Sequence, residues 1–208
     1  MSTSGVTRSM EATTAAEVRQ VARQRRTLPN AWWGVLLLIG TEAALLLAIM
    51  ASYFYLSFHT SQWPPPGVEP PKVALPFALT GALVLTIIPM ALGALAARRG
   101  RLGTTWGLIA FAFLVQAGYL AVQIILFKSD LDKFSPRDSA YGSAYFTLLA
   151  SHHVHVVLGL LLDVGILARL LGGLTNYRAI GVRVIALYWH FVNAMAILVV
   201  LTQLSPSL

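Results

Sequence analysis

The sequence predicts an all-α membrane protein, a bundle of five transmembrane helices. Of its 208 residues, 57% are hydrophobic and only 11% are charged, whereas a soluble domain has roughly 25% charged residues. The mean hydropathy is strongly positive, at +0.70. Five apolar segments exceed the roughly 20 residues that a membrane-spanning helix needs, and they must be helices because backbone groups in lipid have to bond within the segment. The predicted spans run over about 32–58, 74–97, 103–127, 141–171 and 180–203.

Ahead of the first span, residues 1–30 form a polar, Arg-rich tail, and residues 31–208 form the membrane domain. The tail lacks an apolar core followed by a small-residue cleavage site, so we expect no cleaved secretory signal. Glu11 and Glu17 are also unlike the acid-poor composition of a mitochondrial transit peptide. We therefore expect a cytoplasmic tail that ends in the basic stretch EVRQVARQRR.

Prolines shape the next part of the chain. Five of them lie within eight residues of the first loop, at 64–66, 70 and 71, so we expect a stiff, extended connector. Trp63, just before them, fits an anchor at the membrane interface. Pro89 predicts a kink in the second span, and the fourth span, at about 31 residues, must tilt or extend beyond the hydrocarbon.

The basic residues predict the orientation of the bundle. Because each span crosses the membrane, successive connecting segments lie on opposite sides of it. This places eleven of the 15 Lys and Arg residues on the same side as the N-terminus and four on the opposite side. By the positive-inside rule the N-terminus is cytoplasmic and the C-terminus outside, in a bacterial inner membrane. Topology thus accounts for the net charge of +7, and we expect no nucleic-acid partner. The arginines expected to contact lipid phosphate or an acidic partner are Arg98, Arg99, Arg101, Arg178 and Arg183.

Ionisable residues within the spans indicate where polar chemistry is concentrated. Glu42 lies about ten residues into the first span, His152 and His155 about eleven and fourteen into the fourth, and His190 about ten into the fifth. At 1.5 Å per residue, all four fall roughly 15–20 Å from the membrane surface, near the middle of the hydrocarbon. Such residues are costly there and usually have partners, so we expect a polar network that joins three helices.

The fourth span also has a polar face. His152, His155, Gly159 and Asp163 fall within an arc of about 80° on a helix, whereas His153 points about 100° away from His152. Gly159 on this face allows a neighbouring helix to approach closely. We expect the face to pack against another helix, and we expect Asp163 to reach toward Arg169 or interfacial water.

Three functions are open for these residues. A zinc or iron site could use the two histidines His152 and His155 with Glu42 and His190, although five histidines in the whole chain are few for a membrane metalloenzyme. A proton path could use the same groups, but few polar residues lead to the two faces of the membrane. The interpretation that we favour is a carboxylate–imidazole network in which His152, His155 and His190 bond Glu42 and hold the helices together. With no cysteine in the chain, disulfides, iron–sulfur clusters and thiolate chemistry are excluded.

Four stretches, in order, resemble the cytochrome c oxidase subunit III family. The first is WGVLLLIGTEAALLLAIMASYFYL at residues 33–56. In it, Thr41–Glu42 takes the position of the family's Ser–Glu, and Ser52–Tyr53 takes the position of the Ala–Tyr or Ala–Phe that follows about ten residues later. WPPPG matches the loop that follows, HHVHVVLG resembles the family's His–Gly–x–His–Val–x–x–Gly, and YWHFVNAMAILVVL resembles its Tyr–Trp–His–Phe–Val–Asp signature. Together they cover about 32–203. Two departures stand out: His153 replaces a glycine and Asn193 replaces the aspartate.

The resemblance implies an accessory subunit of a respiratory haem–copper oxidase, in the short form that begins at the third of the family's seven helices. Such a subunit has no catalytic, cofactor-binding or metal-binding residues of its own; haem and copper lie in partner subunits. It packs against the catalytic subunit I, binds phospholipid, and supports assembly, proton uptake and oxygen access. The alternatives are the equivalent subunit of a quinol oxidase or nitric oxide reductase, a stand-alone His-rich membrane metalloenzyme, or a small proton transporter.

Overall fold

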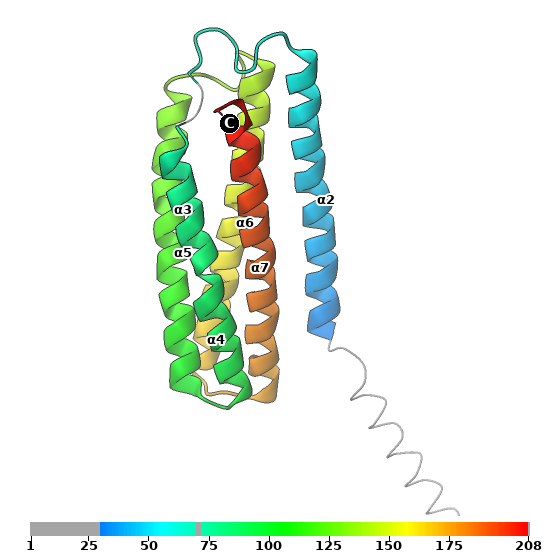
Figure 1. Cartoon of the computed structure of the whole chain (residues 1–208). Helices are drawn as coiled ribbons and strands as arrows, with labels where there is room; N and C mark the ends of the chain where they lie inside the picture. Colours follow the sequence, from blue (N-terminus) through cyan, green and yellow to red (C-terminus); the bar gives the residue numbers. More distant parts are fainter. Residues whose placement is uncertain (1–29, 70–71, 208) are drawn as a thin grey trace, which may run out of the picture.

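Five membrane-spanning helices make up the bundle (Figure 1), as the sequence predicts. The structure is a computed structural model, and it describes residues 30–69 and 72–207; the predicted tail of residues 1–30 lies almost entirely outside this part. The second span, Ala74–Arg98, is built from two helices. In chain order the elements are α2 (Asn30–His59), α3 (Ala74–Leu85), α4 (Ile87–Arg98), α5 (Leu102–Leu131), α6 (Ala140–Leu170), α7 (Asn176–Leu204) and the 3₁₀ helix η1 (Ser205–Ser207).

The second span breaks between α3 and α4, where Pro89 predicts a kink. A proline has no backbone N–H, and its ring crowds the carbonyl four residues earlier, so the helix is interrupted one turn before it. At the break, the amide nitrogen of Thr86 bonds the carbonyl of Leu83 at 3.0 Å, and the hydroxyl of Thr86 donates to the same carbonyl at 2.6 Å. The predicted kink is therefore confirmed, at Thr86.

Side-chain caps and glycines fix the ends of the last two helices. Ser139 Oγ accepts from the amide of Gly142 at the start of α6, and Thr175 Oγ1 accepts from the amide of Arg178 at the start of α7, so each satisfies an N–H that the helix leaves free. The turn between α6 and α7 contains Gly173 at φ 93°, a left-handed conformation that favours glycine.

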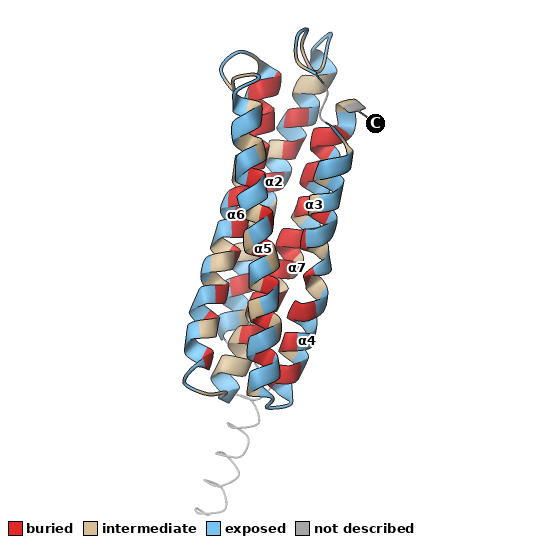
Figure 2. Ribbon diagram, turned by 90° about the vertical axis from the view of Figure 1, so that its left-hand side faces the viewer, coloured by how far each residue is buried: buried red, intermediate tan, exposed pale blue. Residues whose placement is uncertain are grey.

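The helices differ in how much they contribute to the interior. α7 lies beside α2, α3, α4 and α6, whereas α2 lies beside only α6 and α7, at the edge of the bundle. Over the most apolar 18-residue window of each helix, 56% of the residues of α7 are buried but only 17% of those of α2. Figure 2 shows the buried residues concentrated on the inward faces of the helices. We infer that α7 is the core helix and that α2 is peripheral.

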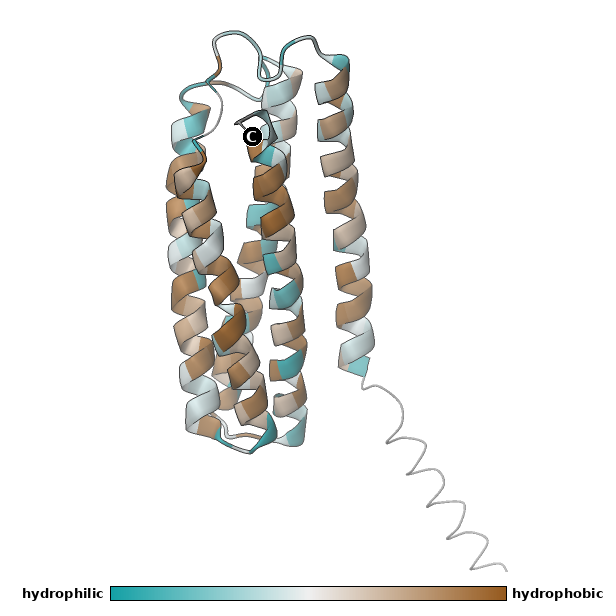
Figure 3. Cartoon of the chain, viewed as in Figure 1, coloured by the Kyte–Doolittle hydropathy of each residue, from teal (hydrophilic) through white to brown (hydrophobic). Residues whose placement is uncertain are grey.

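The outer surface of the bundle is apolar, as a bilayer requires, and several polar side chains are inside. Figure 3 shows hydrophobic ribbon along the helices and hydrophilic ribbon mainly at the two ends. Large apolar residues such as Leu37, Phe58 and Leu161 are more than half exposed, whereas Gln116, Asp163 and Asn193 have no exposed surface. Since lipid tails are as apolar as these side chains, packing and hydrogen bonds have to hold the helices together.

Gly159 of α6 packs directly against Trp189 of α7. A Cβ atom at Gly159 would lie 2.7 Å from Cζ2 of Trp189, whose ring is fully buried. The close approach expected from the sequence is thus a contact between a glycine and an indole ring.

We predict that Gly159→Ala destabilises the protein by about 1–3 kcal/mol, because the added methyl group overpacks the contact with Trp189. The measurement is the free energy of unfolding in mixed detergent micelles. Gly165→Ala on the same helix is the matched control, since no atom lies within 4 Å of its added Cβ. Equal effects of the two substitutions would show that the contact with Trp189 is not tight.

Candidate functional site

Glu42 and His155 form the polar contact between α2 and α6. His155 Nε2 lies 2.8 Å from Glu42 Oε2, and the side chains are 5% and 27% exposed, respectively. His155 Nδ1 lies 2.5 Å from the carbonyl oxygen of Ser151, which can only accept, so Nδ1 carries a hydrogen. The contact is then either an imidazolium donating to a carboxylate or a carboxylic acid donating to a neutral imidazole. In both states the pair shares one proton and has no net charge.

This contact is the attachment point of the peripheral helix. Among the residues that the structure describes, it is the only side-chain hydrogen bond from α2 to another helix. The hydroxyl of Tyr188 on α7 donates to the backbone carbonyl of His155 at 3.1 Å. One residue of α6 therefore bonds both α2 and α7.

His152 faces a different neighbour from the one expected. Its Nε2 lies 3.3 Å from the hydroxyl of Tyr119 on α5, and Gln123 Nε2 donates to that hydroxyl at 3.2 Å. The expectation that His152 bonds Glu42 is therefore wrong. The physical reason is that His152 and His155, three residues apart, point about 60° apart on the helix, which is enough to aim them at different helices.

Asp163 is the third polar residue on this face, and it is completely buried. Trp189 Nε1 on α7 donates to Asp163 Oδ2 at 2.9 Å. When the side-chain amide of Gln116 on α5 is oriented with its nitrogen toward Asp163, that nitrogen also donates to Asp163 Oδ2, at 3.0 Å. The amide oxygen of Gln116 then lies 3.2 Å from Thr86 Oγ1. The expectation that Asp163 reaches Arg169 or interfacial water is wrong, because α5 and α7 cover it.

His190 lies apart from these contacts. It is half-buried and lines a shallow hollow of about 370 Å³ between α2, α4 and α7, together with Trp32, Arg98 and Arg183. The guanidinium of Arg183 lies 5.2 Å from the ring centroid of Trp32. The structure thus does not bring His190 to Glu42, and the predicted network of four residues divides into separate contacts.

The remaining predicted residues occupy several environments. Arg178 Nη1 donates to the carbonyl of Gly173 at 2.6 Å and so closes the turn between α6 and α7. Arg99 and Arg101 are exposed near the turn between α4 and α5. Trp63 packs edge-on against Tyr53 and Tyr141, with ring centroids 5.1 Å away in each case.

Gln116, Tyr119 and Gln123 were not among the predicted site residues, although they complete the contacts of α6. Their spacing of three and then four residues places them on one face of α5, and this polar stripe in an apolar span was a usable signal. Within residues 30–69 and 72–207, no group of three or more His, Cys, Asp or Glu residues is arranged to hold a metal ion.

Comparisons with known proteins agree with the motifs. The family model "Cytochrome c oxidase subunit III" matches residues 15–204. The chain is 29% identical over 174 residues to "Cytochrome bo(3) ubiquinol oxidase subunit 3" of Pseudomonas aeruginosa, covering 82% of each chain. It is 28% identical over 169 residues to "Cytochrome c oxidase subunit 3" of Bacillus subtilis, covering 80% of this chain and 81% of that one. The Neurospora crassa "Cytochrome c oxidase subunit 3" is 30% identical over 177 residues, with 78% of this chain and 62% of the relative covered.

We predict that Glu42→Ala weakens the attachment of α2 and lowers the free energy of unfolding by about 0.6 kcal/mol and at most about 1.7 kcal/mol, the average and the maximum found for hydrogen bonds between membrane helices. Glu42→Gln should lose less, because an amide can still bond His155 Nε2. The measurement is a double-mutant cycle of Glu42→Ala with His155→Ala in detergent micelles.

Thr41→Ala is the control for that cycle, since its hydroxyl bonds the carbonyl of Leu38 in its own helix. A cycle in which the two effects simply add would rule out a direct stabilising contact between Glu42 and His155.

Proposed function

Since the chain belongs to the cytochrome c oxidase subunit III family, we propose that it is the accessory subunit III of a haem–copper terminal oxidase. The observation that carries the proposal is the family match over residues 15–204, which includes all five spans. The similar relatives are named as subunits of a ubiquinol oxidase and of a cytochrome c oxidase. The proposed complex is therefore a haem–copper oxidase whose electron donor is either ubiquinol or cytochrome c.

In this proposal the redox centres belong to the partner subunits, and this chain supports their assembly and turnover. His155 of α6 does not fit haem or copper ligation by this chain. Both ring nitrogens of His155 are engaged, by Ser151 and by Glu42, and Nε2 of His152 is engaged by Tyr119. We derive no chemical step through a metal in this subunit.

The proposed membrane is a bacterial inner membrane, with the turns at 99–101 and 171–175 on the cytoplasmic side. These two turns lie at one end of the bundle, and the first loop, the loop between α5 and α6 and the C-terminus lie at the other (Figure 1). In the described part of the chain, the first end carries Arg98, Arg99, Arg101, Arg169, Arg178 and Arg183, and the second carries Lys72, Lys128, Lys133 and Arg137. The excess of cations at the first end supports this orientation.

We place the proposed phospholipid contact at the hollow that contains Arg98 and Arg183. Both guanidinium groups line it, and neither pairs with a carboxylate among the described residues. Ala91, Ala94 and Leu95 continue the hollow along α4 into the apolar part of the bundle. Two cations beside an apolar hollow suit a phosphate headgroup and its acyl chain. Trp32, which also lines the hollow, suits the membrane interface.

We predict that the tagged chain, isolated from native membranes in mild detergent, brings haem, copper and larger subunits with it. The measurements are an optical haem spectrum and metal analysis of the eluate, repeated after the chain is stripped out alone with a stronger detergent. Haem and copper should be lost from the stripped chain. A chain that elutes alone with stoichiometric zinc or iron would refute the accessory role and support a metalloenzyme.

We predict that the double substitution Arg98→Gln and Arg183→Gln lowers the phospholipid retained per subunit, measured by native mass spectrometry of the purified complex. Losing about 1 kcal/mol of attraction per cation should reduce occupancy about tenfold or more at limiting lipid. The control is Arg99→Gln with Arg101→Gln, which removes two arginines of the same end that do not line the hollow. Unchanged retention in the first variant would exclude this lipid site.

A further inference from the structure

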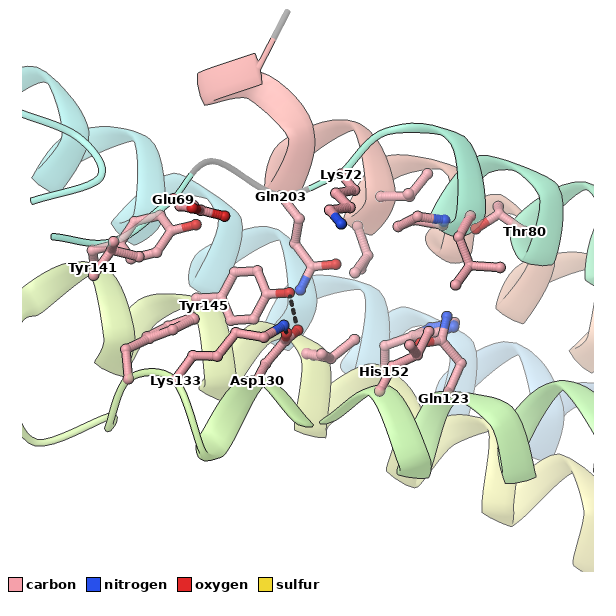
Figure 4. Close-up of a pocket in the computed structure, with 18 of the residues that line it drawn as sticks. Glu69, Lys72, Thr80, Gln123, Asp130, Lys133, Tyr141, Tyr145, His152 and Gln203 are labelled. Carbon is pink, nitrogen blue, oxygen red and sulfur yellow. Dashed lines mark hydrogen bonds and ion pairs between the residues drawn. The ribbon is translucent and has the colours of Figure 1, made fainter. Parts of the chain in front are cut away.

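A cavity of about 700 Å³ opens at the end of the bundle that carries the C-terminus. It lies among α3, α5, α6 and α7, below the two loops of that end (Figure 4). Charged side chains of both signs surround the outer part of the cavity: Glu69, Lys72, Asp130 and Lys133. Lys133 Nζ donates to Asp130 at 2.9 Å, which raises the pKa of Lys133 and keeps it charged. Tyr145 donates to the other oxygen of Asp130 at 3.0 Å.

The cavity extends to the middle of the membrane. Its inner end is lined by Tyr119 and His152. His152 lies twelve residues after Ala140, the first residue of α6, and at 1.5 Å per residue this is about 18 Å along the helix. The polar contact between His152 and Tyr119 therefore forms the inner end of a cavity whose other end is in the loops.

Two residues that line this cavity each have a buried side-chain nitrogen with no hydrogen-bond partner among the described residues. The first is His152 Nδ1 and the second is Gln203 Nε2, and their residues are only 1% and 7% exposed. The hydroxyl of Tyr119 accepts from Gln123 and lies within hydrogen-bond distance of His152 Nε2; when it donates to that nitrogen, the hydrogen of a neutral imidazole is on Nδ1. Both nitrogens are themselves enclosed by protein atoms, so the polar groups that the cavity offers to an occupant are the other polar side chains of its lining.

The chemistry of the lining favours water over an acyl chain as the occupant. Polar side chains occur along the whole length, from Asp130 and Gln203 through Thr80 and Gln123 to His152. An acyl chain would leave these polar side chains facing hydrocarbon, whereas a water molecule makes two to four hydrogen bonds with such groups. At roughly 30 Å³ per molecule, the volume corresponds to on the order of 20 waters.

Beyond the inner end of the cavity, each of its four helices has an apolar side chain that is fully buried, and we call these four side chains the apolar layer. Leu83, Ala112, Val156 and Val192 come from α3, α5, α6 and α7, and none has exposed surface. They belong to one packed cluster. We expect this packed cluster to stop water that enters the cavity.

We propose that the cavity is a water-filled vestibule, open only at the end of the bundle that carries the C-terminus, which brings solvent to His152 in the middle of the membrane. It is a half-channel: solvent and its protons reach a buried imidazole from one side, and the apolar layer prevents a leak to the other side. The inference goes beyond the accessory role and does not depend on the identity of the complex.

The test uses the natural absence of cysteine. Single cysteines are introduced into the full chain in its complex, in sealed membrane vesicles of known sidedness, and treated with a permanently charged methanethiosulfonate. Ala196→Cys and Val199→Cys report on the cavity, which both residues line. Val154→Cys, 66% exposed on the outside of α6 beside His152, is the lipid-facing control, and Ala112→Cys reports on the apolar layer.

We expect Ala196→Cys and Val199→Cys to react about 100-fold faster than Val154→Cys, since lipid at this depth strongly excludes a charged reagent. The reaction should occur only from the side of the C-terminus, and Ala112→Cys should not react. If the two cavity cysteines react with N-ethylmaleimide but not with the charged reagent, the cavity is filled by lipid. If they react with neither reagent, the cavity is closed. Either result, or equal reaction from both sides, would overturn the proposal.

Discussion

The bundle depends on hydrogen bonds made by one helix, α6, in a solvent that cannot replace them. Lipid offers neither donors nor acceptors, so a polar side chain at this depth must find its partner in the protein. Three residues of α6 do so with three different helices: His155 with α2, His152 with α5, and Asp163 with α7. The arrangement of the helices around α6 follows from these contacts.

Packing and polarity act together at the contact between α6 and α7. The ring of Trp189 lies against Gly159, where no Cβ intervenes, and its N–H reaches Asp163 one helical turn away. The glycine thus permits the approach that makes the hydrogen bond possible. Asn193, one turn further along α7, is as fully buried, but its amide has no partner in the described part of the chain.

The two ends of the bundle have different chemistry, and this difference suits a subunit that works at both faces of a membrane. One end presents the Arg98–Arg183 hollow, which suits a phosphate. The other end presents the vestibule with charges of both signs. Between them, the apolar outer faces of α2 and its neighbours are available to lipid and to partner subunits. In the role that we propose, the subunit contributes solvation and lipid contacts, and the redox centres belong to its partner subunits.

The sequence by itself determined the five spans, the break caused by Pro89, and the depth of Glu42 and His155, because length, hydropathy and helical period are local properties. It also predicted that a histidine of the fourth span bonds Glu42. Only the tertiary structure decided which histidine does so, that His152 instead faces Tyr119, and that Asp163 is covered by Trp189 and Gln116. Those pairings depend on the rotation and vertical offset of one helix against another. Packing between distant segments sets both quantities, and no local pattern records them.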